Sequence, residues 1–275
     1  MSSRRAVLTH DVAGSGDPVV LLHGLATTRS IWRLVAPLMT GTRQVVLCDV
    51  PGFGDCRPAG PGFDLAAVAD AVRDNLRAAG VAEPYDLVGH SMGAAVGVQL
   101  AAREPEAVRS LVLVSPVGLR PCSSLTASLL GALAVVHVPL RRAAAPIAVL
   151  GLGRRLLMAG RVVDATAMSA AEVRITVGAS SGATRTREAL EAILTADLRE
   201  PLRDMAVPVG AVWAAQDRLI PAGGAEMLAL LRPCAVSEVV ADAGHLSMVE
   251  RPAAFAEALE KVLVALTAAP VAHVV

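Results

Sequence analysis

A serine flanked by glycines is the residue of this chain best suited to covalent chemistry. Residues 89–93 read Gly-His-Ser-Met-Gly, a G-x-S-x-G pattern centred on Ser91. The sequence before it, 85–88, predicts a short buried strand, and residues 94–102 after it predict a helix. A strand that turns directly into a helix presents the turn residue above the sheet edge, and glycines avoid the collisions that a Cβ would cause there. We therefore predict that Ser91 is a nucleophile on a strained turn.

A nucleophilic serine needs a general base, and the chain has six histidines. We expect His245 to be the base, because it follows the last apolar strand, 236–240, in a loop over the carboxyl edge of a sheet. The side chain of His90 is expected to project away from the serine beside it. The other histidines lie near the termini, in a predicted cap or in the first loop, namely His10, His273, His137 and His23.

The base needs a carboxylate to orient it, and two aspartates compete for that role. Asp217 follows the apolar strand 209–214 and precedes turn residues around Pro221, so it is the preferred candidate. Asp242 lies three residues before His245 and would have to fold back on its own loop to reach the imidazole.

Acyl transfer also needs two backbone donors for the developing oxyanion. We expect the N–H of Met92, at the start of the helix after the serine, and the N–H of Leu25, after a His-Gly pair. The glycine at position 24 would let that loop turn beneath a substrate. His23 itself is expected to be a structural residue of the loop.

The elements that must position these residues alternate along the chain. Short apolar runs predict strands, and they alternate with helices at 65–79 and 253–266, which is typical of a parallel sheet covered on both faces. Between about 117 and 200 the alternation stops and several helices are predicted, so we expect a helical cap inserted at residues 118–200 of a core formed by 1–117 and 201–275. The predicted strands are 19–22, 45–49, 85–88, 111–114, 209–214 and 236–240.

Composition narrows the function classes. With 54% hydrophobic and 18% charged residues in 275, the chain is long and apolar enough for a large packed core. Its 25 basic and 25 acidic residues cancel, so charge gives no case for a nucleic-acid partner. The four cysteines have no metal-ligand or redox spacing, and no apolar leader follows the two arginines near the start. We expect a cytoplasmic protein with reduced thiols and no metal.

Taken together, the motifs resemble those of the α/β-hydrolase family. They are the chain order Ser91, Asp217, His245, the leading pair 23–24, the turn 49–54 and the glycine-flanked serine, and the resemblance runs from about residue 19 to 266. It implies an eight-stranded, mostly parallel sheet with a helical cap, no cofactor, and acyl transfer through a serine ester. Such an enzyme would act on a small-molecule acyl substrate.

Branches of that family can be compared with this chain by residue. Relatives that are haloalkane dehalogenases or epoxide hydrolases use an aspartate nucleophile, and Ser91 argues against both. The carbon–carbon bond hydrolases usually carry Asn before the serine and Trp after the histidine, where this chain has His90 and Leu246. We predict a serine hydrolase that cleaves a carboxylic ester, and the alternatives are a carbon–carbon bond hydrolase, a thioesterase or lactonase, a cofactor-free haloperoxidase, or a non-catalytic ligand-binding member.

The predicted cap gives a clue to the substrate. From residue 120 to 161 it carries arginines but no acidic and no aromatic residue, and its apolar side chains are aliphatic. Residues 121–140 carry no charge, which meets the length criterion for a membrane span, although serines, a histidine and a proline dilute the segment. We expect a cap helix here, with a lid that touches lipid transiently and a true span as alternatives. An aliphatic, arginine-rimmed lid suits an acyl chain, including one with an anionic head. The arginines are Arg120, Arg141, Arg142, Arg154, Arg155 and Arg161.

Overall fold

A single mostly parallel sheet organises the computed structural model of this chain, which describes residues 10–179, 185–220 and 223–268. The sheet order is β1-β3-β2-β4-β5-β6-β7, with β1 antiparallel to β3 and every other neighbouring pair parallel. The strands are β1 (His10–Ala13), β2 (Asp17–Leu22), β3 (Arg43–Cys48), β4 (Tyr85–His90), β5 (Val108–Val114), β6 (Val209–Ala214) and β7 (Val236–Val240).

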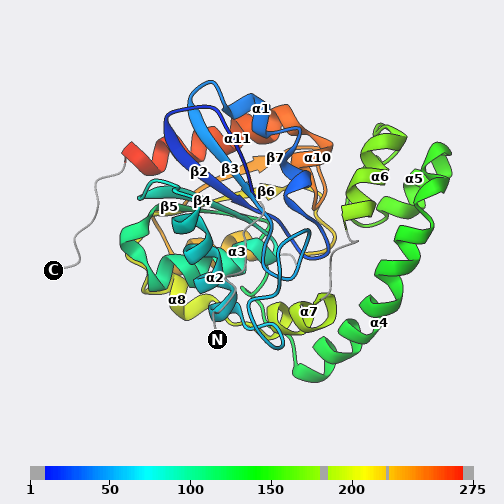
Figure 1. Cartoon of the computed structure of the whole chain (residues 1–275), viewed down its shortest axis with the longest axis horizontal. Helices are drawn as coiled ribbons and strands as arrows, with labels where there is room; N and C mark the ends of the chain where they lie inside the picture. Colours follow the sequence, from blue (N-terminus) through cyan, green and yellow to red (C-terminus); the bar gives the residue numbers. More distant parts are fainter. Residues whose placement is uncertain (1–9, 180–184, 221–222, 269–275) are drawn as a thin grey trace.

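Helices cover both faces of this sheet (Figure 1). Helices α1 (Ala36–Met39) and α11 (Pro252–Ala268) lie on one face, while α2 (Leu65–Ala78), α3 (Met92–Arg103) and α8 (Arg199–Arg203) lie on the other. The apolar strand residues alternate between the two layers: Val20 and Leu22 of β2 belong to one buried cluster, and Val19 and Leu21 belong to the other. This double cover explains why the strands read as continuous apolar runs. The short helices α9 (Gly224–Leu231) and α10 (Ser247–Glu250) complete the described α-helices of the core, which also has 3-10 helices at Arg29–Trp32 and Pro105–Ala107.

The α/β class expected from the sequence is confirmed, but the expected eight strands are not. Seven strands lie within the described residues, and the antiparallel edge consists of β1 alone. Sequence analysis missed β1, because three of its four residues are exposed and it carries no apolar run. A turn through Gly14 and Gly16, both with positive φ, connects β1 to β2.

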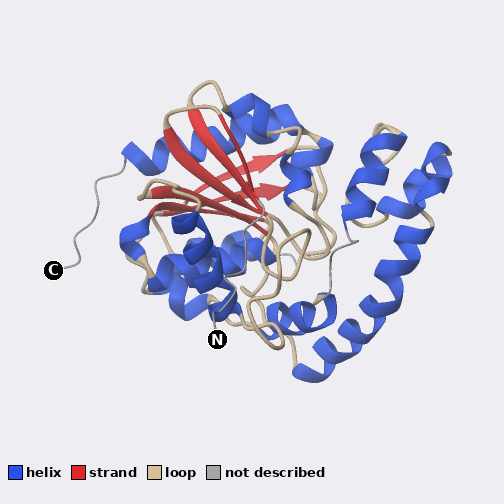
Figure 2. Ribbon diagram, in the orientation of Figure 1, coloured by secondary structure: helices blue, strands red, loops and turns tan. Residues whose placement is uncertain are grey.

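Several helices stand between β5 and β6, where the strand alternation was predicted to stop. They are α4 (Ser124–Ala143), α5 (Gly151–Met158), α6 (Ala170–Gly178) and α7 (Thr186–Thr195), and Figure 2 shows them beside the sheet rather than on its faces. Two of them begin at side-chain caps: at α4 Ser123 accepts the N–H of Thr126 at 3.2 Å, and at α6 Ser169 and Glu172 form a reciprocal capping box. We refer to residues 118–195 as the cap. The division into core and cap at residues 118 and 200 stays a prediction, and α8 lies with the core helices (Figure 1).

Helix α4 is the cap element with the least cover. Only Ala127 and Gly131 are buried among its 20 residues, although the helix is strongly apolar. Among the described residues it is the one helix long and apolar enough to cross a membrane by length and composition, with a mean hydropathy of 1.4. One face of α4 packs along α7, which lies beside it in Figure 1.

Candidate active site

The turn between β4 and α3 carries Ser91 in a strained conformation. Its backbone has φ +52° and ψ −110°, a region that non-glycine residues rarely adopt. The flanking glycines are required by close packing: a Cβ on Gly89 would lie 2.3 Å from the carbonyl oxygen of Gly93, and one on Gly93 would lie 2.6 Å from that of Leu22. The sequence pattern therefore folds into the sharp strand-to-helix turn that it predicts.

The loops after β6 and β7 bring Asp217 and His245 together. The Nδ1 of His245 lies 2.7 Å from the Oδ2 of Asp217, and both side chains are about nine-tenths buried. The Oδ1 of Asp217 accepts the backbone N–H groups of Leu219 at 2.8 Å and Ile220 at 3.1 Å. A proton on Nδ1 satisfies the Asp217 contact and leaves Nε2 of the imidazole able to accept a proton.

The same contacts hold Asp217 in its charged form. Burial alone would raise the pKa of Asp217, but the hydrogen bond and charge of His245 and the two backbone N–H groups outweigh it, and the pKa falls to about 2. The rival carboxylate, Asp242, lies outside this arrangement, since its Oδ1 accepts from the side-chain amide of Gln216 at 3.5 Å. The structure thus pairs His245 with Asp217.

Ser91 and His245 meet at one cavity, which has a volume of about 730 Å³. Each residue is 6% exposed and lines that cavity, together with the first loop and helices of the cap. Between these two described residues there is no direct hydrogen bond, and such bonds are often long before a substrate is bound. Both residues therefore border one space, and their roles there remain a proposal.

His90 is a neighbour of Ser91 whose function sequence reasoning missed. Its Nε2 lies 3.0 Å from the carbonyl oxygen of His245, its ring centre lies 4.6 Å from that of His245, and it also lines the cavity. Burial, followed by repulsion from His245, lowers the pKa of His90 well below its usual value, so the ring is neutral and donates from Nε2. His90 is thereby hydrogen-bonded to the backbone of the loop that carries His245.

The first loop is fixed by a buried polar network. The Nε2 of His23 accepts the backbone N–H of Val50 at 3.0 Å, and its Nδ1 lies 2.8 Å from the carbonyl oxygen of Gly24. Burial lowers the pKa of His23, which is consistent with one donor and one acceptor nitrogen. His23 therefore serves the loop as the structural residue that the sequence predicts.

The two expected oxyanion donors lie beside Ser91. Met92 is the first residue of α3, where helix N–H groups have no partner within the helix. Leu25 lines the cavity, and the preceding Gly24 is so close to Ser91 that a Cβ there would lie 3.2 Å from the serine Cβ. This placement is compatible with two converging N–H groups, and their role remains a proposal.

Glu250, in α10, is a second residue that sequence analysis did not identify. Its Oε2 accepts the N–H of Gly244, beside His245, at 2.8 Å. Its Oε1 accepts the N–H groups of Val163 at 2.7 Å and Asp164 at 2.9 Å, in the cap. One carboxylate thus ties the histidine loop to the cap, and no local pattern in the sequence signals this contact.

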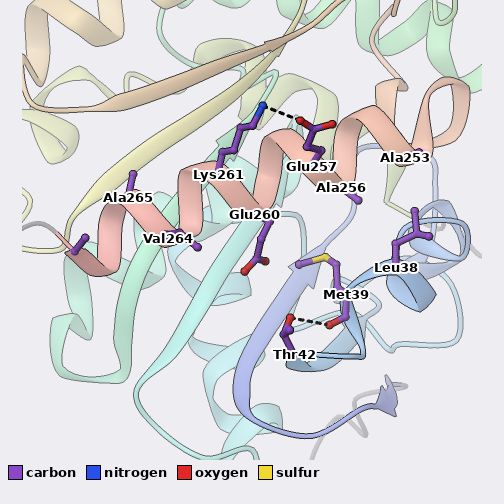
Figure 3. Close-up of a pocket in the computed structure, with 11 residues that line it drawn as sticks. Leu38, Met39, Thr42, Ala253, Ala256, Glu257, Glu260, Lys261, Val264 and Ala265 are labelled. Atoms are coloured by element: carbon purple, nitrogen blue, oxygen red, sulfur yellow. Dashed lines mark hydrogen bonds and ion pairs between the residues drawn. The ribbon is translucent and has the colours of Figure 1, made fainter.

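A second hollow, of about 680 Å³, lies on the opposite part of the core between α11 and the turn after α1 (Figure 3). Its charged residues are paired: Lys261 with Glu257 at 2.8 Å, and Glu260 with Arg43 at 3.0 Å. Its described lining contains no serine, cysteine or histidine, so it does not repeat the serine–histidine arrangement of the first cavity. Within the described residues there is also no cluster of three or more His, Cys, Asp or Glu side chains that could hold a metal.

Comparison with known proteins places this geometry in context. A family model described as the alpha/beta hydrolase fold matches residues 17–252. The acetyltransferase component of an acetoin cleaving system from Cupriavidus necator is 29% identical over 257 residues, which cover 90% of this chain and 64% of that protein. The chain thus spans less than two thirds of that relative's length.

Shorter matches include two enzymes. A pimeloyl-[acyl-carrier protein] methyl ester esterase of Neisseria meningitidis is 41% identical over 97 residues, 35% of this chain and 29% of that protein. A 2-hydroxymuconate semialdehyde hydrolase of Pseudomonas is 38% identical over 114 residues, 40% of each chain.

Two solved structures have the same fold. A membrane phospholipase A superposes with a TM-score of 0.72 at 25% identity, covering 95% of this chain and 84% of that one. A bromoperoxidase from Bacillus anthracis superposes with a TM-score of 0.79 at 17% identity, covering 94% of this chain and 95% of that one, which is a likeness of fold alone.

Proposed function

Because the chain belongs to the alpha/beta-hydrolase family, we propose that it is a serine hydrolase that cleaves a carboxylic ester of a small, mainly aliphatic substrate. The observation that carries this proposal is the 2.7 Å contact between His245 and Asp217 at a cavity that Ser91 also lines. A base oriented by a carboxylate beside a serine on a strained turn is the arrangement that activates a hydroxyl.

In the proposed cycle Ser91 Oγ attacks the acyl carbon and His245 Nε2 takes the hydroxyl proton. Asp217 stabilises the imidazolium, and the N–H groups of Leu25 and Met92 bind the oxyanion. The leaving alcohol receives the proton from His245, which then takes a proton from water as that water attacks the acyl-enzyme. His245 then returns that proton to Ser91 Oγ as the acid leaves, so the free enzyme is restored and no electron donor or acceptor is consumed.

The test is covalent labelling followed by kinetics. A fluorophosphonate probe should label the wild-type protein and the Ser237→Ala variant, a serine on β7, but not Ser91→Ala. Ester turnover should fall roughly 10⁴- to 10⁶-fold in Ser91→Ala. Labelling of a different serine, or most activity left in Ser91→Ala, would refute the assignment. Absence of any labelling would favour a non-catalytic ligand-binding protein.

The acyl group is the part of the substrate that the cavity supports best. Its apolar lining is aliphatic and comes from both core and cap, for instance Leu25 of the first loop and Leu190 of α7. Ester hydrolysis should therefore become faster as the acyl chain lengthens from acetyl to octanoyl, because each buried methylene contributes about 0.8 kcal/mol. A strict preference for acetyl esters contradicts this, and a panel that includes thioesters and lactones separates the alternative acyl bonds.

A further inference from the structure

The cavity that contains Ser91 is lined by cations without anions. Among its described lining residues are Arg141 and Arg161, whereas none is Asp or Glu. The guanidinium of Arg141 already donates to the carbonyl oxygen of Leu157. The side chain of Arg161, in contrast, has no such acceptor among the described residues.

The backbone of Arg161 is held against the histidine loop. Its carbonyl oxygen accepts the N–H of Leu246, directly after His245, at 3.0 Å, and its own N–H donates to Met158 at 2.9 Å. On the other side Gly244 packs so closely that a Cβ there would lie 2.8 Å from the Arg161 carbonyl oxygen. The position of Arg161 is thus fixed relative to the proposed base.

The side chain of Arg161 has no hydrogen-bond or ion-pair partner among the described residues, although Arg161 is partly buried and lines the cavity. Burial lowers the pKa of Arg161 to about 10, and no neighbouring charge opposes this effect. The group is still charged at neutral pH, and a partly desolvated charge without a partner is unfavourable.

Two other arginines in sheltered positions are paired with carboxylates. Arg43, of which 9% is exposed, lies 2.9 Å from Asp86, and Arg29 is bound by Asp11 and Asp49. At these two positions the core supplies a carboxylate for the cation, whereas no described carboxylate pairs with Arg161. An arginine in this state has the geometry and charge to bind an oxyanion through two parallel hydrogen bonds.

We propose that Arg161 binds an anionic group, a carboxylate or a phosphate, on the same substrate that presents its acyl carbon to Ser91. This inference rests on the proposed function and defines its substrate class as an aliphatic acyl ester with a second, charged end. The aliphatic lining of the cavity would contact the chain between the two ends.

Matched esters test the proposal. Monomethyl esters of linear dicarboxylic acids with six to ten carbons, and the corresponding ω-phosphono esters, are compared with methyl esters of monocarboxylic acids of equal length. For at least one length, kcat/KM should favour a charged ester by 10-fold or more. The preferred anion identifies the group, carboxylate or phosphate.

Variants assign the preference to the side chain. The ratio of kcat/KM for the charged over the neutral ester should fall 10- to 100-fold in Arg161→Gln and recover in part in Arg161→Lys. The control Arg174→Gln, an exposed cap arginine on α6, should keep the wild-type ratio. A wild-type preference for neutral esters at every length, or an unchanged ratio in Arg161→Gln, would overturn the proposal.

A binding measurement separates this proposal from the proposed function. Calorimetry with monomethyl suberate and Ser91→Ala needs no turnover, and Arg161→Gln in that background should weaken binding 10- to 100-fold. If the wild-type enzyme hydrolyses no ester but this loss is observed, the anion site stands and the esterase proposal fails. Equal affinity in the two variants means that Arg161 does not bind the anion.

The exposed side of α4 forms a second, separate surface of interest. Large aliphatic residues recur there at helical spacing and are about half or more exposed. The exposed strip continues onto α5 through Leu152 and Leu156, at 68% and 61%. The residues on α4 are Leu125 at 72%, Leu129 at 60%, Leu133 at 65%, Val136 at 68% and Leu140 at 64%.

The charged residues near the aliphatic strip indicate which kind of surface this face complements. No acidic residue occurs between positions 120 and 161, and Arg142 on α4 and Arg155 on α5 are exposed. The carboxylates of α7, against which α4 packs, are engaged by arginines, for example Glu191 with Arg187 at 2.9 Å. A second copy of the same face would bring like charges together, whereas an anionic bilayer complements both the aliphatic and the basic side chains.

We propose that α4 lies flat on an anionic lipid surface. Leu133, Val136 and Leu140 belong to the exposed strip and also line the cavity, so the docked face is continuous with the space that contains Ser91. An amphiphilic ester could then pass from lipid to the cavity along one apolar surface.

Vesicle co-sedimentation tests this docking without any enzymatic assay. The protein should bind vesicles of phosphatidylcholine with 30% phosphatidylglycerol and bind pure phosphatidylcholine at least 10-fold more weakly. Arg142→Gln and Arg155→Gln should each weaken binding about fivefold, as expected for about 1 kcal/mol per cation. Binding should also weaken as salt rises.

The aliphatic contribution has its own control. Leu125→Ser with Leu129→Ser should reduce vesicle binding at least 10-fold, whereas Leu230→Ser on α9, which is 78% exposed, should not change it. Equal binding to neutral and anionic vesicles, or no binding to either, would overturn the proposal. A concentration-dependent dimer abolished by the α4 substitutions would show instead that a second copy covers this face.

Discussion

Helices α3 and α4 are both rich in aliphatic residues but have opposite surroundings. In α3, nine of 12 residues are buried, and the helix packs on the sheet through β4 and β5. In α4, two of 20 residues are buried, and the helix packs chiefly against α7. Apolar composition alone therefore does not distinguish a core helix from one whose apolar side faces outward.

The difference has a consequence for energetics. Burial of the α3 residues stabilises the fold, because their apolar surface is removed from water. The exposed leucines of α4 contribute little to the folding of the isolated chain. We therefore expect substitutions in α3 to change the free energy of unfolding, and equivalent substitutions on the outer face of α4 to change interactions with partners.

The largest expected effect is at Gly93, in the first turn of α3. A Cβ there would lie 2.6 Å from the Leu22 carbonyl oxygen and 2.7 Å from that of His23, and backbone cannot move aside cheaply. Gly93→Ala should lower the free energy of unfolding by more than about 4 kcal/mol, or prevent accumulation of folded protein.

The matched cap substitution is Gly178→Ala, at the end of α6, where a Cβ meets no atom within 4 Å. Alanine is favoured over glycine in helices, so this variant should be as stable as wild type or gain up to about 1 kcal/mol. Urea denaturation followed by circular dichroism measures both. Equal stability of the two variants would contradict the distinction between the closely packed core helix α3 and the loosely packed helices of the cap.

Leucine truncation gives the next largest difference. Leu100 in α3 is 1% exposed, so Leu100→Ala should cost about 2–5 kcal/mol through lost burial and the cavity that remains. Leu129 in α4 is 60% exposed, and Leu129→Ala should change the free energy of unfolding by less than about 0.5 kcal/mol. The midpoints of urea unfolding report both values. A comparable cost at the two sites would show that α4 belongs to the folding core.

The strands of the core were predictable because their signal is local. Continuous apolar runs located β2, β6 and β7 within two residues at each end, and the glycine-flanked serine located the turn before α3. Strand β1 was not predictable, because it is short and mostly exposed and pairs only through its backbone with β3.

The contacts of the site also fall into those that the sequence predicts and those that it does not. His245 and Asp217 follow apolar strands, and the parallel topology brings the ends of those strands to one edge, so their contact could be predicted. The contacts of Glu250 and Arg161 link segments far apart in the chain and depend on how the cap docks. Helix α4 could be predicted as a helix, but its exposed face depends on which neighbours the fold provides.

The smallest effect that we predict concerns pH and compares a core histidine with a cap histidine. Burial holds the pKa of His90 well below 6.5, so the folded protein does not bind a proton there when the unfolded chain does. Proton uptake by the unfolded state lowers stability as pH falls below 6.5 and leaves it unchanged above that pH. This effect should cost roughly 1 kcal/mol between pH 6.5 and 5.5.

The His90→Gln variant should therefore lose less stability over that interval than wild type, although its stability at pH 7.5 is lower. His23 is also buried and its pKa is also lowered, so part of the slope should remain in this variant. His137→Gln, at an exposed position of α4, should retain the wild-type slope. Urea unfolding at pH 5.5, 6.5 and 7.5 measures the three slopes. If His90→Gln and His137→Gln change the slope equally, the buried histidine is not the group that takes up the proton on unfolding.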